Sequence, residues 1–399
     1  MIAIGNEYQE SRKKSAFSVE FIPSSYKQAI NCPENKKWQT AIKKEWDSMF
    51  KNDVWEVVDV PIDRKCVRSK WVENGNLLKF KSRLVAMGCT QVEGVATYAP
   101  TKIFNKSDVD LCAFLQASLD EEIYMTLPDG FKDVYGVQKA LKLKKSIYGL
   151  KQSSREFHGK LANILITLGW KQFKSDSCMF MKNSEIIIHH VDDLLFGSSS
   201  VESNLITNIN KHMRIMDQGH VRHYLKMKID YNLKSRVCKI SQPAYVQELL
   251  EEFNLENIQT KRTPLCPHTI LDKVELNEEE KIKMQKLPYR ELLGRINYLA
   301  CTSRPDLSIA VTRLAPYSNC YGSLHWNQLI HVIQYLKYSR NDGIFLIPND
   351  DGLQAFSDSD WGGDRPTRRS TTGYIIKFCG SILMWKSTLQ KSVAHSHGC

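Results

Sequence analysis

Apolar residues recur at helical spacing in several parts of the chain. Trp38, Ile42, Trp46 and Met49 fall on one stripe after Pro33, which predicts a helix there. A polar stretch over residues 259–285 interrupts the pattern and is expected to be a linker. Helices predicted on the same ground cover residues 157–168 (ended by Gly169), 201–216, 245–253, 288–301 and 324–339.

Short apolar runs bounded by turn residues predict strands between these helices. Asn74-Gly75-Asn76 reads as a turn that precedes the strand carrying Lys81 and Arg83 on one face. Strands are expected at residues 54–58, 79–86, 225–231, 238–241, 353–358, 374–379 and 381–385. The last three form an antiparallel meander, which is expected either to dock against helices around Trp326 and Ile330 or to remain the segment least protected from hydrogen exchange.

Residues 185–197 read as a β-hairpin with Asp192 and Asp193 at its turn. Two adjacent carboxylates between apolar strands are costly, because each charge loses hydration and repels the other. A divalent metal offsets that cost, and palm-type polymerases use such a hairpin with a third Asp to hold two Mg²⁺ ions. The alternative is an exposed Asp-Asp turn between edge strands, since Asp is a common turn residue.

Length, charge and cysteine usage narrow the class of protein. A chain of 399 residues favours two or three domains, and a net charge of +11 favours a polyanionic partner such as nucleic acid. The strongest basic cluster lies at residues 139–155. The eleven cysteines include no Cys-x-x-Cys pair, which indicates reduced thiols. No apolar run reaches membrane-spanning length and no signal peptide is recognised, so a cytoplasmic or nuclear protein is expected.

A series of sequence blocks, in order along the chain, resembles the reverse transcriptase of copia-type LTR retrotransposons. The most specific are Leu-Lys-Lys-Ser-Ile-Tyr-Gly-Leu-Lys-Gln at residues 143–152 and Val-Asp-Asp-Leu-Leu at residues 191–195. Further blocks occur at residues 38–55, 70–72, 80–88, 90–94, 113–131, 302–307, 358–361, 368–374 and 385–387. The resemblance therefore runs nearly from end to end.

The resemblance implies an α+β fold with reverse-transcriptase fingers, palm and thumb, connection helices and an incomplete RNase H-like β-meander. The expected regions are a loosely ordered leader at residues 1–25, fingers and palm at 26–200, thumb and connection at 201–345, and a truncated RNase H-like segment at 346–399. The implied reaction is RNA-directed DNA synthesis. Its partners would be an RNA template, a DNA primer and deoxynucleoside triphosphates.

The resemblance also implies the metal ligands. Asp192 and Asp193 would hold two Mg²⁺ ions, for which Mn²⁺ could substitute, together with a third carboxylate from Asp108 or Asp110. Asp108 follows the Asp-Val order of the family, whereas Asp110 alternates onto the same strand face. Both upstream residues could instead belong to a solvated turn.

Three further residues are implied to surround the nucleotide. Lys81 and Arg83 suit the triphosphate by charge, and Gln152 suits the sugar or primer side. An ordinary solvated face is the alternative for these side chains. His190 stands where the family usually has Tyr.

Two departures from the family bear on activity. The family carries a palm helix where this chain has only residues 101–107 between Pro100 and Asp108, so the polymerase could be inactive and the chain a non-catalytic nucleic-acid-binding remnant. The RNase H-like segment offers Asp358 as its first catalytic acid and no complete carboxylate set, so RNase H activity is not expected. A phosphatase built on Asp-x-Asp would need a doubly wound strand-helix alternation, which the pattern lacks.

Overall fold

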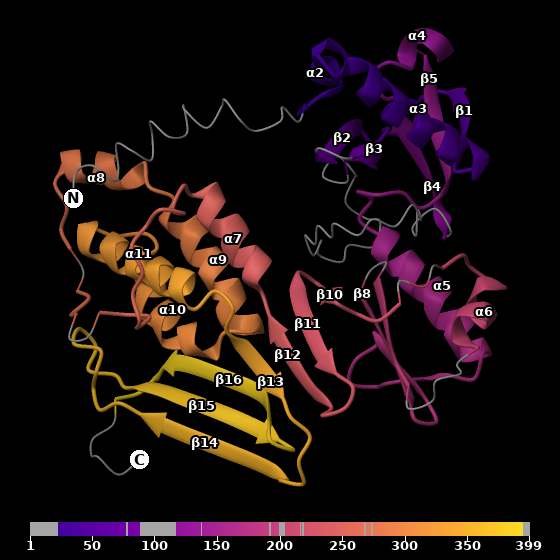
Figure 1. The fold of residues 1–399 in the computed structure, drawn as a ribbon. Coiled ribbons are helices and arrows are strands. Elements are labelled where there is room, and N and C mark those ends of the chain that lie inside the picture. The colour runs from indigo at the N-terminus through magenta and orange to yellow at the C-terminus, as the bar shows by residue number, and fades with distance from the viewer. Residues whose placement is uncertain are drawn as a thin grey trace. The chain divides into compact units, whose positions relative to one another are not determined.

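The computed structural model divides the chain into two compact units, Ser18–Gly219 and His220–Cys399 (Figure 1). The predicted leader, except for its last three residues, lies outside the described residues. The residues that the structure describes are 23–76, 79–87, 117–136, 138–190, 193–198, 204–215, 217, 219–266, 269–272 and 274–393.

The first unit begins with helices and a sheet that share one core. The helix predicted from Trp38, Ile42, Trp46 and Met49 is confirmed, and all four side chains are buried. Ile42, Trp46 and Met49 pack with apolar residues of the sheet. The elements are α2 (Tyr26–Asn31), α3 (Asn35–Lys51), a short α4 (Lys132–Tyr135) and a three-stranded antiparallel sheet of β1 (Trp55–Asp59), β5 (Lys139–Lys145) and β4 (Ser118–Thr126), in that order.

A separate hairpin of β2 (Ser69–Asn76) and β3 (Lys79–Ala86) corrects the turn prediction at Asn74-Gly75-Asn76. Those residues lie inside β2, where Gly75 pairs with Phe80 and Asn76 pairs with Lys79. The backbone ladder extends through residues of low strand propensity because interstrand pairing outweighs that weak preference. Sequence reading therefore placed the turn too early.

The second sheet of the first unit is antiparallel and is backed by helix α5 (Ser153–Thr167), which ends before Gly169 as predicted. Phe157, Leu161 and Leu165 of α5 pack with Phe180 and Ile187 of the sheet. The strands run in the order β6 (Lys171–Gln172), β7 (Met179–Lys182), β8 (Glu185–His190) and β9 (Asp193–Gly197).

The helix predicted over residues 201–216 is shorter than expected. The observed helix is α6 (Leu205–Asn210). The side-chain oxygen of Asn210 accepts a hydrogen bond from the backbone N–H of Ile215 at 2.8 Å. A side chain that takes over a backbone partner competes with helix continuation, so the helix stops there. Leu205, Ile209 and Met213 are buried as the spacing predicted, whereas Val201 and Met216 lie outside the described residues.

The second unit joins a four-stranded antiparallel sheet to a helical core. The strand predicted at residues 225–231 begins two residues later, at Met227, because Leu225 and Lys226 adopt positive φ angles of 50° and 62° in a tight turn. The strands are β10 (His223–Tyr224), β11 (Met227–Asn232), β12 (Val237–Ser241) and β13 (Gly343–Leu346).

The helices of the second unit bury one large apolar cluster from α7, α9, α10 and α11. The predicted linker at residues 259–285 is wrong at its end, where α8 begins with a capping box between Asn277 and Glu280. Helix α8 has no buried residue and hence no apolar stripe for pattern reading to detect. The helices are α7 (Pro243–Glu252), α8 (Glu278–Gln285), α9 (Tyr289–Thr302), α10 (Ser308–Leu314) and α11 (Ser323–Tyr338), with 3₁₀ turns at Pro305–Leu307 and Ala315–Tyr317.

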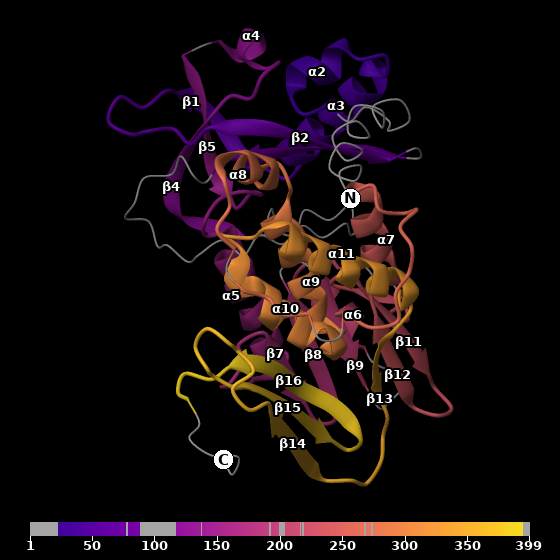
Figure 2. The same cartoon turned by 90° about the vertical axis from the view of Figure 1, so that its left-hand side faces the viewer.

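The predicted C-terminal meander forms as β14 (Leu353–Ser359), β15 (Thr371–Phe378) and β16 (Ser381–Leu389). Figures 1 and 2 show β16 as the strand beside the helices. Its contacts are with α9 and α10 rather than around Trp326 and Ile330: Trp385 Nε1 donates to the Ala300 carbonyl at 2.6 Å, and Thr312 Oγ1 donates to the Ser387 carbonyl at 2.9 Å. Within the described residues, no helix has the length and apolar character needed to cross a membrane.

Candidate active site

The predicted acidic hairpin is present in the sheet backed by α5. Strands β8 and β9 pair antiparallel, and their last pair joins His190 to Asp193. Asp193 is half-buried at the first position of β9. Asp192 lies outside the described residues, as do Asp108 and Asp110. Of the expected metal ligands, the structure therefore describes Asp193 alone, which lies in β9 beside the predicted turn.

The hairpin is held on a packed support. Ile187 of β8 and Phe180 of β7 are almost completely buried against α5, and Leu205 and Ile209 of α6 complete the cluster. Close packing of this kind fixes strand positions because small displacements lose many van der Waals contacts. Asp193 thus begins a strand of a well-supported sheet.

Residues 146–152 of the 143–152 block form a tight loop against β3, directly after β5. Gly149 has φ +93°, and a Cβ atom there would lie 2.0 Å from the carbonyl oxygen of Ala86. The Ala86 N–H donates to the Tyr148 carbonyl at 2.9 Å, and Ser153 Oγ donates to the Ile147 carbonyl at 2.6 Å. Glycine is needed both for its backbone angle and for this close approach. The Tyr-Gly pair therefore serves to join the loop to the strand that carries Lys81 and Arg83.

Arg83 lies beside this loop. Ser82, Leu84 and Ala86 are buried, so Arg83 lies on the opposite face of β3. The guanidinium carbon of Arg83 stands 4.8 Å from the ring centroid of Tyr148, a cation–π distance. The side chain of Lys81 lies outside the described set.

Gln152 is buried at the end of the same loop. Its Nε2 donates to a carboxylate oxygen of Glu121 on β4 at 3.3 Å, and only 2% of the residue is exposed. The structure thus brings the loop that carries Gln152 against the strand that carries Arg83. The Gln152 amide is also engaged with Glu121, a partner that sequence reading had not paired with it.

The basic cluster at residues 139–155 is largely neutralised locally. Lys142 pairs with Glu122 at 2.8 Å, Lys139 with Asp59 at 2.8 Å and Lys144 with Asp53 at 3.0 Å. These acids come from β4, β1 and the turn before β1, which flank β5 on both sides. Glu122 holds the pKa of Lys142 above its usual value through a hydrogen bond and its charge. The positive electrostatic potential that this cluster presents to a polyanion is therefore weaker than its number of lysines suggests.

Asp358 stands in a different setting, on strand β14 of the second unit. Its side chain is exposed, and one carboxylate oxygen accepts the N–H of Ser359 at 2.8 Å. Among the described residues, Asp358 belongs to no group of three side chains that could share a metal ion. Within the described part of the chain, Asp358 therefore has no neighbouring ligands with which to hold a metal ion.

One group of potential ligands was missed by sequence reading. His158 of α5, Cys178 before β7 and His189 of β8 offer ligand atoms that all lie within 4.8 Å of one another. Burial lowers the pKa of His158. The pKa of His189 is lowered to about 4, mainly by burial and to a smaller extent by the charges of His158 and His190. No short motif could reveal this group, because the residues are separated by whole elements of the fold.

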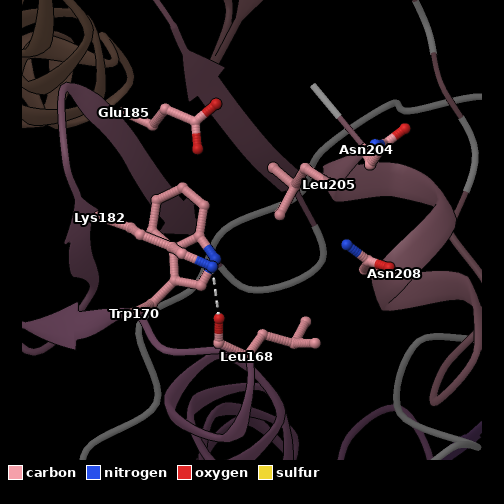
Figure 3. A pocket seen from close by; sticks show the side chains of 7 residues that line it. All are labelled: Leu168, Trp170, Lys182, Glu185, Asn204, Leu205 and Asn208. Atoms are coloured by element: carbon pink, nitrogen blue, oxygen red, sulfur yellow. Dashed lines mark hydrogen bonds between the residues drawn. The ribbon is translucent and has the colours of Figure 1, made fainter. Parts of the chain in front are cut away.

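A small cavity of about 230 Å³ lies on another side of the same sheet (Figure 3). Lys182 Nζ donates to the Leu168 carbonyl at 2.7 Å, and Ser198 Oγ donates to Glu185 at 3.2 Å. The two charged side chains are thus engaged within the protein, and we assign the cavity no ligand. Its lining residues are Leu168, Trp170, Lys182, Glu185, Asn204, Leu205 and Asn208.

Comparison with known proteins bears directly on this region. The family described as reverse transcriptase (RNA-dependent DNA polymerase) matches residues 97–267. The chain is 31% identical over 408 residues to the retrovirus-related Pol polyprotein from transposon TNT 1-94 of Nicotiana tabacum, covering 94% of this chain and 31% of the relative. It is 30% identical to that from transposon RE1 of Arabidopsis thaliana, covering 92% and 27%. The chain thus spans about a third of the length of these curated relatives.

A solved structure of a foamy viral protease-reverse transcriptase in complex with double-stranded DNA is also similar. It has 13% sequence identity and a TM-score of 0.45, and the match covers 89% of this chain and 56% of that chain. The α+β class follows from the helices and antiparallel sheets described above. The resemblance drawn from the sequence blocks is confirmed: residues 97–267 match the reverse transcriptase family, and over 92–94% of its length the chain is similar to Pol polyproteins of plant retrotransposons.

Proposed function

We propose that this chain is the RNA-directed DNA polymerase region of a retrotransposon Pol polyprotein and that it extends a DNA primer on an RNA template. The observation that carries the proposal is the β8–β9 hairpin, which pairs His190 with Asp193 and lies inside the matched family range. Hairpins with paired carboxylates suit two-metal nucleotidyl transfer, since hard oxygen ligands are those that Mg²⁺ prefers. Among the proposed metal ligands, Asp193 lies within the described residues.

The donor set fits divalent ions. Asp193 is half-buried beside apolar residues of β9, a setting in which a carboxylate favours a cationic partner. Asp192 and either Asp108 or Asp110 would complete the set, and two Mg²⁺ ions, or Mn²⁺, would supply the charge that lowers the pKa of the primer hydroxyl and offsets the triphosphate. Overall, the primer 3′-oxygen bonds to the α-phosphorus, the bond to pyrophosphate breaks, and the hydroxyl proton passes to solvent.

The chain's own side chains position the nucleotide. Arg83 and Lys81 share one face of β3, and their positive charge suits the triphosphate of a deoxynucleotide. Gln152 lies in the loop joined to that strand and suits the sugar or primer side once its amide is released from Glu121. The Gly149 contact fixes the loop against β3 and therefore fixes the spacing between these groups.

The regional division follows from the same proposal. Residues 26–200 would form fingers and palm, residues 201–345 thumb and connection, and residues 346–399 a truncated RNase H-like segment without cleavage activity. Along the chain, the boundary between the two compact units falls between Gly219 and His220, whereas the proposed palm ends at residue 200. The proposed compartment is the cytoplasm or nucleus, where templates and nucleotides are present.

The second candidate is a nucleic-acid-binding remnant without catalysis. It is favoured by the short stretch at residues 101–107, where the family carries a palm helix, combined with the net charge of +11. In that case the protein would bind nucleic acid with an affinity that falls as salt rises, yet would not extend a primer.

Primer extension separates the two candidates. The full chain is incubated with a DNA primer on an RNA template and deoxynucleotides, with Mg²⁺, Mn²⁺ or EDTA. The polymerase proposal expects metal-dependent extension that Asp192→Asn abolishes and Asp133→Asn, an exposed acid on α4, leaves intact. Salt-dependent binding without extension under either metal would contradict it and support the remnant. Unchanged affinity between low and physiological salt would exclude both.

A further inference from the structure

We propose that His158, Cys178 and His189 form a zinc site beneath the acidic hairpin. The three ligand atoms lie within 4.8 Å of one another and come from α5, from the turn before β7 and from β8. Two imidazole nitrogens and one thiolate form a set typical of tetrahedral Zn²⁺, with water at the fourth position. The site is independent of the nucleotide chemistry, because none of the three side chains belongs to the proposed polymerase machinery.

The two histidines already face each other across the helix–sheet interface. His158 Nδ1 and His189 Nε2 are 2.7 Å apart, and the ring centroids are 4.8 Å apart at an interplanar angle of 27°. Two nitrogens on one tetrahedral zinc lie about 3.3 Å apart, given Zn–N bonds near 2.0 Å. An opening of about 0.6 Å at the half-exposed His158 would therefore admit the ion.

Backbone contacts hold the cysteine at the same place. The N–H of His189 donates to the carbonyl of Cys178 at 3.0 Å, which ties the turn to β8. Asp176 accepts the N–H of Cys178 at 2.8 Å and brings a negative charge close to both Cys178 and His189. Nearby negative charge favours a cation in this group.

The ring of His189 is buried and only partly hydrogen-bonded, and an ion bound at its Nε2 would replace the contact with His158 while leaving Nδ1 unchanged. His189 is 4% exposed, and its Nδ1 has no hydrogen-bond partner among the described residues. The contact with His158 therefore uses only one side of a buried polar ring, an arrangement that costs free energy. His158 and Cys178 are half-buried, so the group remains open to solvent on one side. An ion entering from that side would displace the thiol proton to solvent as the zinc–sulfur bond forms.

Such an ion would connect three segments of the palm region. Helix α5, the turn at Cys178 and strand β8 would be linked through one metal ion. Its ligand His189 lies three residues before Asp192 in the sequence. Metal binding that requires the folded arrangement stabilises it, because the unfolded chain does not hold the ligands together. The expected role is structural support of the hairpin.

The test uses the full chain without a histidine tag. After purification and dialysis we expect about one equivalent of zinc per chain by elemental analysis. Replacement by Co²⁺ should give thiolate-to-cobalt charge-transfer absorption, which carboxylate sites cannot produce. Cys178→Ser should abolish that absorption, and His158→Gln should weaken zinc affinity at least roughly tenfold.

Matched substitutions control for folding and for other sites. Cys66→Ser changes another half-buried thiol, and His212→Gln changes an exposed histidine of the same unit; both should keep the metal. Circular dichroism confirms that each variant is folded. A wild-type chain that retains no zinc and gives no cobalt–thiolate absorption would overturn the proposal, as would absorption that survives Cys178→Ser. Asp193→Asn should leave zinc content unchanged, so failure here is distinct from failure of the polymerase proposal.

Discussion

The sequence predicted catalytic acids in two antiparallel sheets, Asp193 in one and Asp358 in the other, and the two side chains lie in different surroundings. Asp193 is the first residue of β9, in a sheet whose Phe180 and Ile187 are buried against α5. Asp358 lies on β14, an edge strand of the meander, with its side chain exposed. A half-buried carboxylate is less hydrated than an exposed one, so nearby positive charge affects it more strongly.

The side chains near the two acids also differ in burial. Ile187 beneath the hairpin is 1% exposed, whereas Phe356, two residues before Asp358, is 55% exposed. The meander contacts the helices through Trp385 and Ser387 of β16, while β14 lies at the far edge. Packing thus fixes the hairpin acid in place and leaves the meander acid without that constraint. This difference is why we assign chemistry to the first acid alone.

The largest expected effect separates the two acids directly. Asp193→Asn should lower primer extension by at least about two orders of magnitude, since it removes a charged oxygen ligand at the reacting centre. Asp358→Asn should change extension less than about twofold, because its surroundings hold no described ligand group. Single-nucleotide incorporation rates measure both. Equal losses in the two variants would remove the distinction between the sheets.

The second prediction compares the supports. Ile187→Ala should lower the free energy of unfolding by about 2–4 kcal/mol, because it leaves a cavity under the hairpin. Phe356→Ala should change it by less than about 1 kcal/mol, since that ring is mostly in water already. Urea unfolding followed by hydrogen exchange in each sheet measures the effect. A larger loss for Phe356→Ala would mean that the meander is the better-packed sheet.

The third prediction concerns pH and applies to metal-free protein in EDTA. Burial lowers the pKa of His189 from its usual 6.5 to about 4, with contributions from His158 and His190 against an opposing one from Asp176. The unfolded chain therefore binds more protons between these values. The stabilisation is fully present above pH 6.5 and is lost as pH falls, by roughly 3 kcal/mol below pH 4.

A pair of variants isolates this slope. His189→Gln should flatten the fall in stability between pH 6.5 and 4, whereas His223→Gln, an exposed histidine of the second unit, should not. Urea unfolding across that pH range provides the measurement. A slope that persists unchanged in His189→Gln would assign the acid sensitivity to another group.

The smallest expected effect tests how the meander is attached. Trp385→Phe removes the N–H that donates to the Ala300 carbonyl and should cost about 1 kcal/mol. Because β16 provides that contact, hydrogen exchange should accelerate in β14–β16 and remain unchanged in β8–β9. Mass-resolved exchange measures both regions in one experiment. Unchanged protection of the meander would show that other contacts suffice to hold it.

The sequence predicted elements where one face is consistently apolar. Helices α3 and α5, the β8–β9 hairpin and the three meander strands follow their patterns because burial dictates both the residues and the element. It missed α8, which buries no residue, and it overran α6, where Asn210 redirects the backbone. Local polar contacts of this kind determine where a helix begins or ends, but they produce no periodic pattern of apolar residues in the sequence.

The site was predictable only in part for a related reason. The position of Asp193 in the hairpin and that of Arg83 on the exposed face of β3 follow from short sequence patterns. The Gln152–Glu121 contact and the group of His158, Cys178 and His189 depend on which segments the fold brings together. Contacts between residues far apart in sequence have no local signature, so only the structure reveals them.

The central claim is that the hairpin acids and an upstream Asp hold two metal ions. The most direct measurement is anomalous diffraction from crystals of the chain with primer, template, nucleotide and Mn²⁺. We expect two Mn²⁺ peaks about 4 Å apart, contacted by Asp192, Asp193 and either Asp108 or Asp110. Carboxylates of both upstream residues more than about 10 Å from the hairpin acids, with no pair of peaks between them, would contradict the account.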